Sequence, residues 1–136
     1  MGRILGLDIG DRRIGIALSD ETRLIASPLE VYERVGWGPD VRHIKALAET
    51  HAADLIVSGL PRNMDGSEGF QAQKVRELCQ QIEKAGLTVL FQDERLSTTA
   101  AQKALIEGDM RRAERKTTVD KVAAAVILQA YLDANR

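Results

Sequence analysis

The sequence is poor in cysteine, in aromatic residues and in long apolar runs, and each shortage excludes a class of protein. The single cysteine, Cys79, excludes a disulfide framework and a cysteine-rich zinc site. No apolar run approaches the roughly 18 residues that a membrane span needs, and no signal peptide is recognisable. Aromatic residues make up 4% of the chain, too few for a platform that reads a base sequence by stacking. These shortages predict a soluble protein of a reducing compartment, the cytoplasm.

An excess of either charge is also missing. Lys and Arg number 19 and Asp and Glu number 20, which gives a net charge of -1 and an isoelectric point near 6.1. Proteins dedicated to nucleic-acid binding usually carry a basic excess. The bulk charge therefore ranks nucleic acid low among the partners, although a sum says nothing about where the charges lie.

What the chain does contain is the composition of one folded domain. Its 136 residues are 44% hydrophobic and 29% charged, with 3 prolines and no repeat or linker, which favours a single domain over residues 1–136. A chain of this length buries roughly two-thirds of its unfolded surface, enough for a core without disulfide or metal staples.

The apolar periodicity predicts an α/β protein. Strands are predicted at 3–9, 14–19, 23–27, 54–59 and 87–92, the third ended by Pro28. Helices are predicted from Pro39 to Ala48, at 71–85, from Ser97 or Thr98 to near Gly108, and at 118–132, with the basic stretch 109–116 outside them. Short turns join the first three strands into an antiparallel meander, and the last two strands alternate with helices and run parallel. The result is a mixed five-stranded sheet flanked by helices.

Asp8 is the first of three carboxylates in unexpected places. It lies late in a strand whose neighbours Leu5, Leu7 and Ile9 are apolar. A buried carboxylate is unfavourable unless it is paired, hydrogen-bonded or bound to a metal. The alternative is structural, with Asp8 accepting hydrogen bonds from the amides of the turn at 10–13.

Glu94 and Asp120 are the other two. Glu94 directly follows a predicted parallel strand, at the sheet edge where α/β proteins bind ligands, although its neighbours also allow a plain surface ion pair. Asp120 stands in the first turn of the last helix, where the helix dipole favours an anion. At helical spacing it also shares a face with Ala124 and Ile127, a face that should pack on the sheet.

Together these positions predict three carboxylates that converge. Like charges repel, so a cation is expected between them. Oxygen ligands favour Mg²⁺ or Mn²⁺, with a substrate phosphate completing the coordination, and no histidine or cysteine lies near these segments to favour zinc. The residues therefore suggest a phosphoryl-transfer site.

Four blocks of sequence, in order, resemble the YqgF (RuvX-like) family. They are the opening GLDIG (6–10) with RIGIA (13–17), then GLP and NMDGSEG within 59–69, DERLST (93–98) and VDKVAA (119–124). The resemblance runs from end to end and implies an RNase H-like fold with Asp8, Glu94 and Asp120 as the catalytic, metal-binding acids. It also implies a metal-dependent nuclease that matures the 5′ end of precursor 16S ribosomal RNA or resolves Holliday junctions.

By analogy with RNase H-like nucleases, the resemblance implies hydrolysis with two Mg²⁺ or Mn²⁺ ions about 4 Å apart. The partner is then structured RNA or branched DNA, recognised by shape and backbone. A monomer suffices to trim an end, whereas two coordinated cuts in a junction favour a homodimer.

Cationic and polar side chains near the three acids are candidates for binding the nucleic-acid backbone, because arginine matches phosphate oxygens bidentately. Each has a plainer interpretation as a tether for a carboxylate, a loop residue or part of a solvated face. They are Arg13, Asn63, Ser67, Arg95, Arg111, Arg112, Arg115, Lys116 and Lys121.

Two rival functions stay open. The GLDIG block also resembles the phosphate motif of sugar kinases and actin-like ATPases, but those enzymes enclose ATP between two such domains and this chain has room for one. A non-catalytic nucleic-acid-binding module is the second rival, and loss of metal ligands would be its expected sign. All three acids are present.

Overall fold

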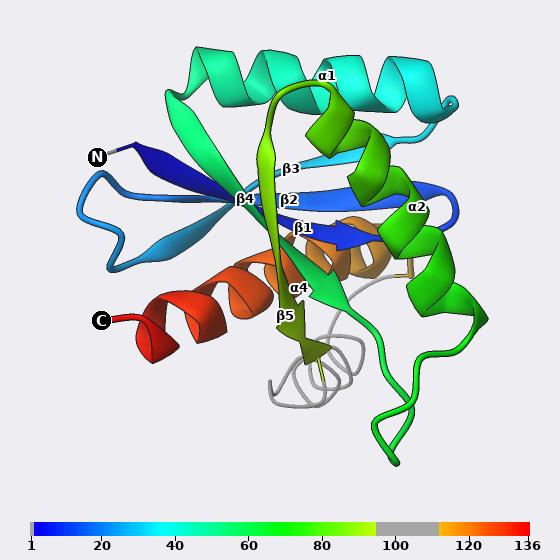
Figure 1. Cartoon of the computed structure of the whole chain (residues 1–136). Coiled ribbons are helices and arrows are strands. Elements are labelled where there is room, and N and C mark those ends of the chain that lie inside the picture. Colours follow the sequence, from blue (N-terminus) through cyan, green and yellow to red (C-terminus); the bar gives the residue numbers. More distant parts are fainter. Residues whose placement is uncertain (1, 95–111) are drawn as a thin grey trace.

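The structure, a computed structural model of the chain, describes residues 2–94 and 112–136. The elements follow in the order β1 (Arg3–Ile9), β2 (Arg13–Ser19), β3 (Ala26–Glu33), α1 (Trp37–Thr50), β4 (Ala53–Leu60), α2 (Phe70–Lys84), β5 (Thr88–Asp93) and α4 (Arg112–Ala134) (Figure 1). Among the described helices, none is long and apolar enough to cross a membrane.

The strands form one mixed sheet in the order β3-β2-β1-β4-β5. β2 pairs antiparallel with both β1 and β3, while β4 runs parallel to β1 and β5 runs parallel to β4. The carboxyl ends of β1, β3, β4 and β5 therefore lie at the same edge of the sheet. The predicted meander followed by parallel strands is confirmed.

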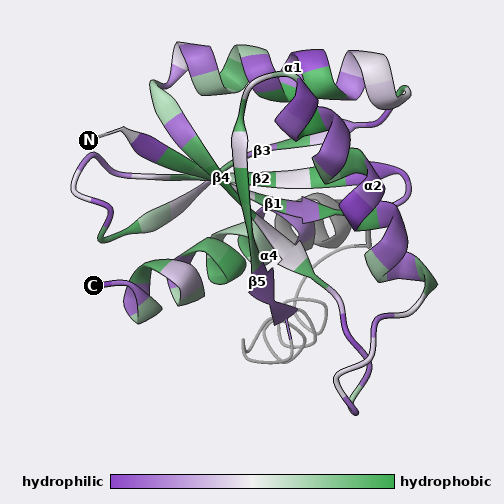
Figure 2. Cartoon of the chain, viewed as in Figure 1, coloured by the Kyte–Doolittle hydropathy of each residue, from purple (hydrophilic) through white to green (hydrophobic). Residues whose placement is uncertain are grey.

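Helices cover both faces of the sheet, α1 and α2 on one and α4 on the other (Figure 1). The apolar colouring in Figure 2 is concentrated in the strands and along much of α4. The face under α1 and α2 is filled by large side chains, among them Leu5, Leu7, Ile14, Ile16, Ile44, Ile56, Leu78 and Ile82. The face under α4 is built from Ile4, Ala17, Val57, Ala124, Ile127, Leu128 and Leu132.

The third strand differs from its predicted bounds. Pro28 was expected to end it at 27, but the strand runs from Ala26 to Glu33 with Pro28 inside it, opposite Ala17. β3 is an edge strand, where a missing N–H donor is tolerated, and the register shifts between Ile16 and Ala17 at this position. The prediction failed because proline ends central strands, not edge strands with an irregularity.

The last helix also begins earlier than predicted. It starts at Arg112 rather than at a cap on Thr118, so most of the stretch read as an irregular basic segment is helical. Arg, Ala, Glu and Lys are all strong helix formers, so this stretch can be helical without an apolar period in its sequence. The helix predicted from Ser97 or Thr98 to Gly108 lies outside the described residues.

Candidate active site

Asp8 lies on the α4 face of the sheet because side chains alternate along β1. Leu5, Leu7 and Ile9 belong to the core under α1 and α2, so residues of opposite parity, Ile4 and Asp8, face α4. Asp8 is half-buried, one residue before β1 ends. The strand thus delivers a carboxylate to the carboxyl edge of the sheet, beneath the last helix.

Asp120 is brought to Asp8 by a glycine. Gly15 is the β2 partner of Asp8 in the antiparallel register. A Cβ atom at Gly15 would lie 2.0 Å from the main-chain oxygen of Asp120, so the α4 backbone rests directly on β2 at this position. Any larger residue would push the helix away. The absence of a side chain at residue 15 therefore sets the height of Asp120 above the sheet.

Glu94 is placed by a second close approach. It follows the last residue of β5, and the neighbouring strand β4 presents Gly59 beneath it. A Cβ atom at Gly59 would lie 3.1 Å from Oε1 of Glu94 and 2.7 Å from Cδ1 of Ile127 on α4. The carboxylate of Glu94 thus lies over the α4 face of β4.

The three carboxylates line one open cavity of about 510 Å³. Its described lining consists of Asp8, Ile9, Gly10, Asp11, Arg12, Arg13, Pro61, Gln71, Glu94 and Asp120. Within residues 2–94 and 112–136, no three His, Cys, Asp or Glu side chains are gathered closely enough to hold one metal ion. The structure therefore brings the three acids to one cavity without drawing them to a single point.

A buried ion pair braces the turn between β1 and β2. Asp40 on α1 is fully buried and accepts hydrogen bonds from the Val35 amide at 2.9 Å and from Nε of Arg34 at 2.9 Å. Arg34 in turn donates to the main-chain oxygen of Gly10 at 3.0 Å, and its amide donates to that of Arg12 at 2.8 Å. The turn that carries Gly10, Asp11 and Arg12 of the cavity lining is thereby tied to α1.

The Asp40 carboxyl of this ion pair is stabilised in its charged form. Burial alone would raise the pKa of Asp40, but hydrogen bonds from the Val35 and Gly36 amides and from Arg34 outweigh it and hold the pKa below its ordinary value of 3.8. Sequence reasoning missed both residues, because Asp40 reads as an ordinary acid in the first turn of a helix. Only the β3–α1 connection, seen in three dimensions, brings Arg34 to Gly10.

The predicted substrate-binding residues have different positions. Arg13 lines the cavity, and its Nε also lies 3.3 Å from Oε1 of Glu33 on β3. Asn63 and Ser67 are not among the described lining. The Asn63 side-chain amide donates to Ser67 Oγ at 3.0 Å, so the two close their own loop.

Only part of the predicted basic stretch lies within the described residues. Arg112, Arg115 and Lys116 lie on the first turns of α4, and Lys121 follows Asp120 on the same helix without appearing in the described cavity lining. Arg95 and Arg111, also predicted to bind the substrate, lie outside the described residues.

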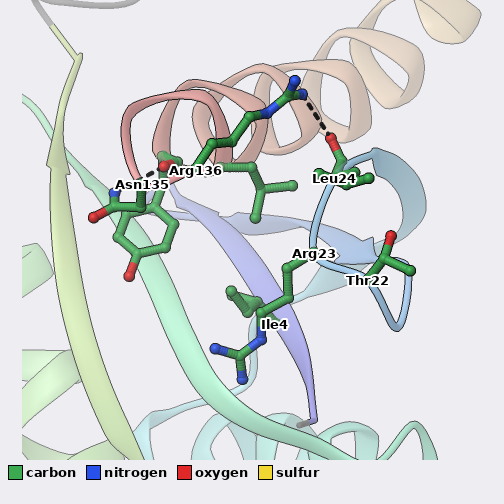
Figure 3. A pocket seen from close by; sticks show the side chains of 8 residues that line it. Ile4, Thr22, Arg23, Leu24, Asn135 and Arg136 are labelled. Carbon is green, nitrogen blue, oxygen red and sulfur yellow. Dashed lines mark hydrogen bonds between the residues drawn. The ribbon is translucent and has the colours of Figure 1, made fainter.

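A second cavity, of about 350 Å³, lies at the other end of the sheet (Figure 3). It is lined by Ile4, Thr22, Arg23, Leu24, Tyr131, Leu132, Asn135 and Arg136, with no carboxylate in its described lining. Both arginines are already bonded to protein, Arg23 to Asp54 and to the Gly2 carbonyl, Arg136 to the Leu24 carbonyl. This cavity has the character of a packing gap.

Known proteins resemble this chain over nearly its whole length. A family model described as RuvX, Holliday junction resolvase, matches residues 2–134. A relative from Clostridioides difficile (strain 630) is 46% identical over 133 residues, 97% of this chain and 94% of its own. One from Clostridium botulinum (strain Hall) is 48% identical over 133 residues, 97% of each chain. Both carry a name that states an inferred activity, pre-16S rRNA nuclease.

Solved structures share the fold at low sequence identity. Thermus thermophilus RuvC in complex with a Holliday junction substrate superposes with a TM-score of 0.60 at 16% identity, over 99% of this chain and 96% of that one. The fowlpox virus resolvase in complex with Holliday junction DNA gives 0.55 at 14% identity, over 98% of each chain. The expected RNase H-like fold is confirmed.

Proposed function

The chain belongs to the RuvX family of nucleases, and from that membership and the cavity of three carboxylates we propose that it hydrolyses phosphodiester bonds in 5′-end maturation of precursor 16S ribosomal RNA. The observation that carries the proposal is that Asp8, Glu94 and Asp120, from three separate elements, line one open cavity. The named activity of relatives at 46–48% identity supports the choice of RNA. On the same ground we propose that the protein acts in the cytoplasm.

The donor set fits a hard divalent cation. All three acids offer oxygen ligands only, which suits Mg²⁺ or Mn²⁺, and a cation between them would offset their like charges. Asp8, Glu94 and Asp120 would hold one or two such ions. A bound ion would lower the pKa of an attacking water and stabilise the leaving oxygen.

The residues of the chain then bind and orient the substrate. Arg12 and Arg13 line the same cavity as the acids, so their guanidinium groups can meet the phosphate oxygens bidentately. The Arg34–Asp40 pair holds the turn that carries Arg12 and leads into Arg13. The cavity is open to solvent, which admits an extended polynucleotide backbone as well as water.

Cleavage of one strand needs one site, and a monomer suffices. Junction resolution is the second candidate, favoured by the family's description as a Holliday junction resolvase, and it would require two coordinated cuts from a homodimer.

The test is a parallel assay in Mn²⁺ with precursor 16S ribosomal RNA and a four-way DNA junction. The control is the triple variant Asp8→Asn, Glu94→Gln, Asp120→Asn. Metal-dependent cleavage of the RNA that the triple variant lacks is the expected result. Cleavage of the junction alone would favour resolution, and binding of either substrate without metal-dependent cleavage would favour a non-catalytic module.

A further inference from the structure

Phe70 is a large aromatic side chain left in water. It is the first residue of α2, and 73% of it is exposed. A single exposed apolar side chain is ordinary on a protein surface and means nothing by itself. Its position in the fold and its immediate neighbours are what set it apart.

Phe70 stands at the rim of the acidic cavity. It follows β4, which runs parallel to β1, so it lies at the same edge of the sheet as Asp8. The next residue, Gln71, lines the cavity together with Pro61 from the start of the same loop. Phe70 is therefore the sequence neighbour of a residue that lines the cavity, which the substrate backbone would enter.

A cation is held beside the ring. Nζ of Lys74 lies 4.7 Å from the centroid of the Phe70 ring and 3.3 Å from Oδ1 of Asp11. Asp11 itself lines the cavity. The Lys74 ammonium thus links the ring to the cavity, and it occupies only one of the two ring faces.

The loop that leads into Phe70 is held in place. Nη2 of Arg76 donates to Oε2 of Glu68 at 2.7 Å, and Nε donates to Oε1 at 2.5 Å. The Arg76 guanidinium also packs over the Phe91 ring, 4.8 Å from its centroid. Because these contacts hold the backbone just before Phe70, the start of α2 loses little freedom when a ligand binds to the ring.

We propose that Phe70 stacks on an unpaired nucleobase adjacent to the phosphate that enters the cavity, with Lys74 close to the backbone of the same nucleotide. The inference rests on the proposed function, because the cavity supplies the reason for a nucleic acid to pass this rim. Every base has a π-face, so one stacked base selects single-stranded over paired segments without selecting a sequence. A stacked base would fix which phosphate of the strand lies in the cavity, whereas three metal-binding acids treat every phosphate alike.

The test uses fluorescent single-stranded RNA and DNA with 2-aminopurine at successive positions. Stacking on Phe70 quenches 2-aminopurine at one position in the bound complex. Phe70→Leu keeps an apolar side chain but removes the ring, and it should abolish that quench and weaken binding roughly 5- to 150-fold. Phe70→Tyr should preserve both, and Ile25→Ala, which alters an exposed apolar residue in the distant β2–β3 connection, should change neither.

An abasic nucleotide at the quenched position provides the coupling test. If the base contacts Phe70, removing the base and removing the ring should weaken binding by no more than either change alone. Independent, additive losses, or a Phe70→Leu protein that binds and quenches like the wild type, would overturn the inference while leaving cleavage intact. A wild-type protein that quenches the probe but cleaves no substrate in Mn²⁺ would instead refute the proposed function and leave the stacking site standing.

Discussion

The two faces of the sheet differ in the size of the side chains that they present to their helices. Toward α1 and α2 the strands offer leucines and isoleucines, and the helices lie on a layer of large aliphatic groups. Toward α4 they offer Gly15 and Gly59, over which the helix and Glu94 come within distances that any Cβ atom would obstruct. Asp8, Glu94 and Asp120 all belong to this second face or to its edge.

The difference in side-chain size implies that the α1/α2 face mainly stabilises the fold, whereas the α4 face mainly positions the acids of the cavity. Thick aliphatic packing stabilises in proportion to buried area and tolerates exchange of similar volumes. A close backbone contact stabilises little by area, but it fixes the position of Asp120 relative to Asp8. Changes on the α1/α2 face should therefore lower the free energy of unfolding, and changes on the α4 face should lower the rate of cleavage.

The largest effect is expected at Asp8. Asp8→Asn keeps the size of the side chain but removes a charged metal ligand, and loss of several kcal/mol of transition-state stabilisation corresponds to at least about 10³-fold in kcat. The thermal midpoint should change little, because Asn matches Asp in size at this half-buried position. Single-turnover cleavage in Mn²⁺ and a melting curve measure the two quantities. Full activity in the Asn variant would remove Asp8 from the catalytic set.

The Arg34–Asp40 pair is an exception to this difference between the faces, because a change there should lower both stability and activity. Asp40→Asn leaves the Arg34 guanidinium partly buried beside a neutral amide, and breaking such a pair costs about 3–5 kcal/mol. Because the pair also holds the Gly10 carbonyl, activity should fall with stability, unlike at other sites under α1.

The pH dependence of stability identifies the Asp40 charge as the cause. A pKa held below 3.8 means that the carboxylate stabilises the wild type fully above that pH and progressively less as the pH falls through the lower, folded value. The difference in free energy of unfolding between wild type and Asp40→Asn should therefore be greatest near neutral pH and shrink below about pH 4. A difference that is independent of pH in denaturant titrations would assign the loss to packing instead.

A pair of leucines compares the two faces directly. Leu78 on α2 and Leu128 on α4 are both fully buried, and truncation of either to alanine should destabilise by about 2–5 kcal/mol. Only Leu128→Ala loosens the helix that carries Asp120, so only this variant should also lose kcat at a temperature where both stay folded. Equal kcat values in the two variants would show that α4 does not need tight packing to act.

The sequence predicted the elements that carry the site better than it predicted the contacts that build it. The apolar pattern put Asp8 late in a buried strand, and helical spacing with Ala124 and Ile127 put Asp120 on the sheet-facing side of its helix. The role of Gly15 was not predictable, because a glycine in a strand is equally typical of a bulge or a close approach until the opposing helix is known. Asp40 was hidden for the same reason, since its partner Arg34 is set by tertiary structure.

Gly15→Ala is the smallest change that tests the close approach. The added methyl group would meet the main-chain oxygen of Asp120, an atom that cannot rotate away, so α4 must shift from β2. Overpacking of this kind destabilises by about 1–3 kcal/mol, and a displacement of Asp120 by about 1 Å can lower kcat roughly 100-fold. Gly36→Ala is the matched control, because a Cβ atom there meets nothing within 4 Å. If Gly15→Ala lost stability but kept kcat, the catalytic position of Asp120 would not depend on the height of α4, and the separation between the two faces would reduce to one of packing alone.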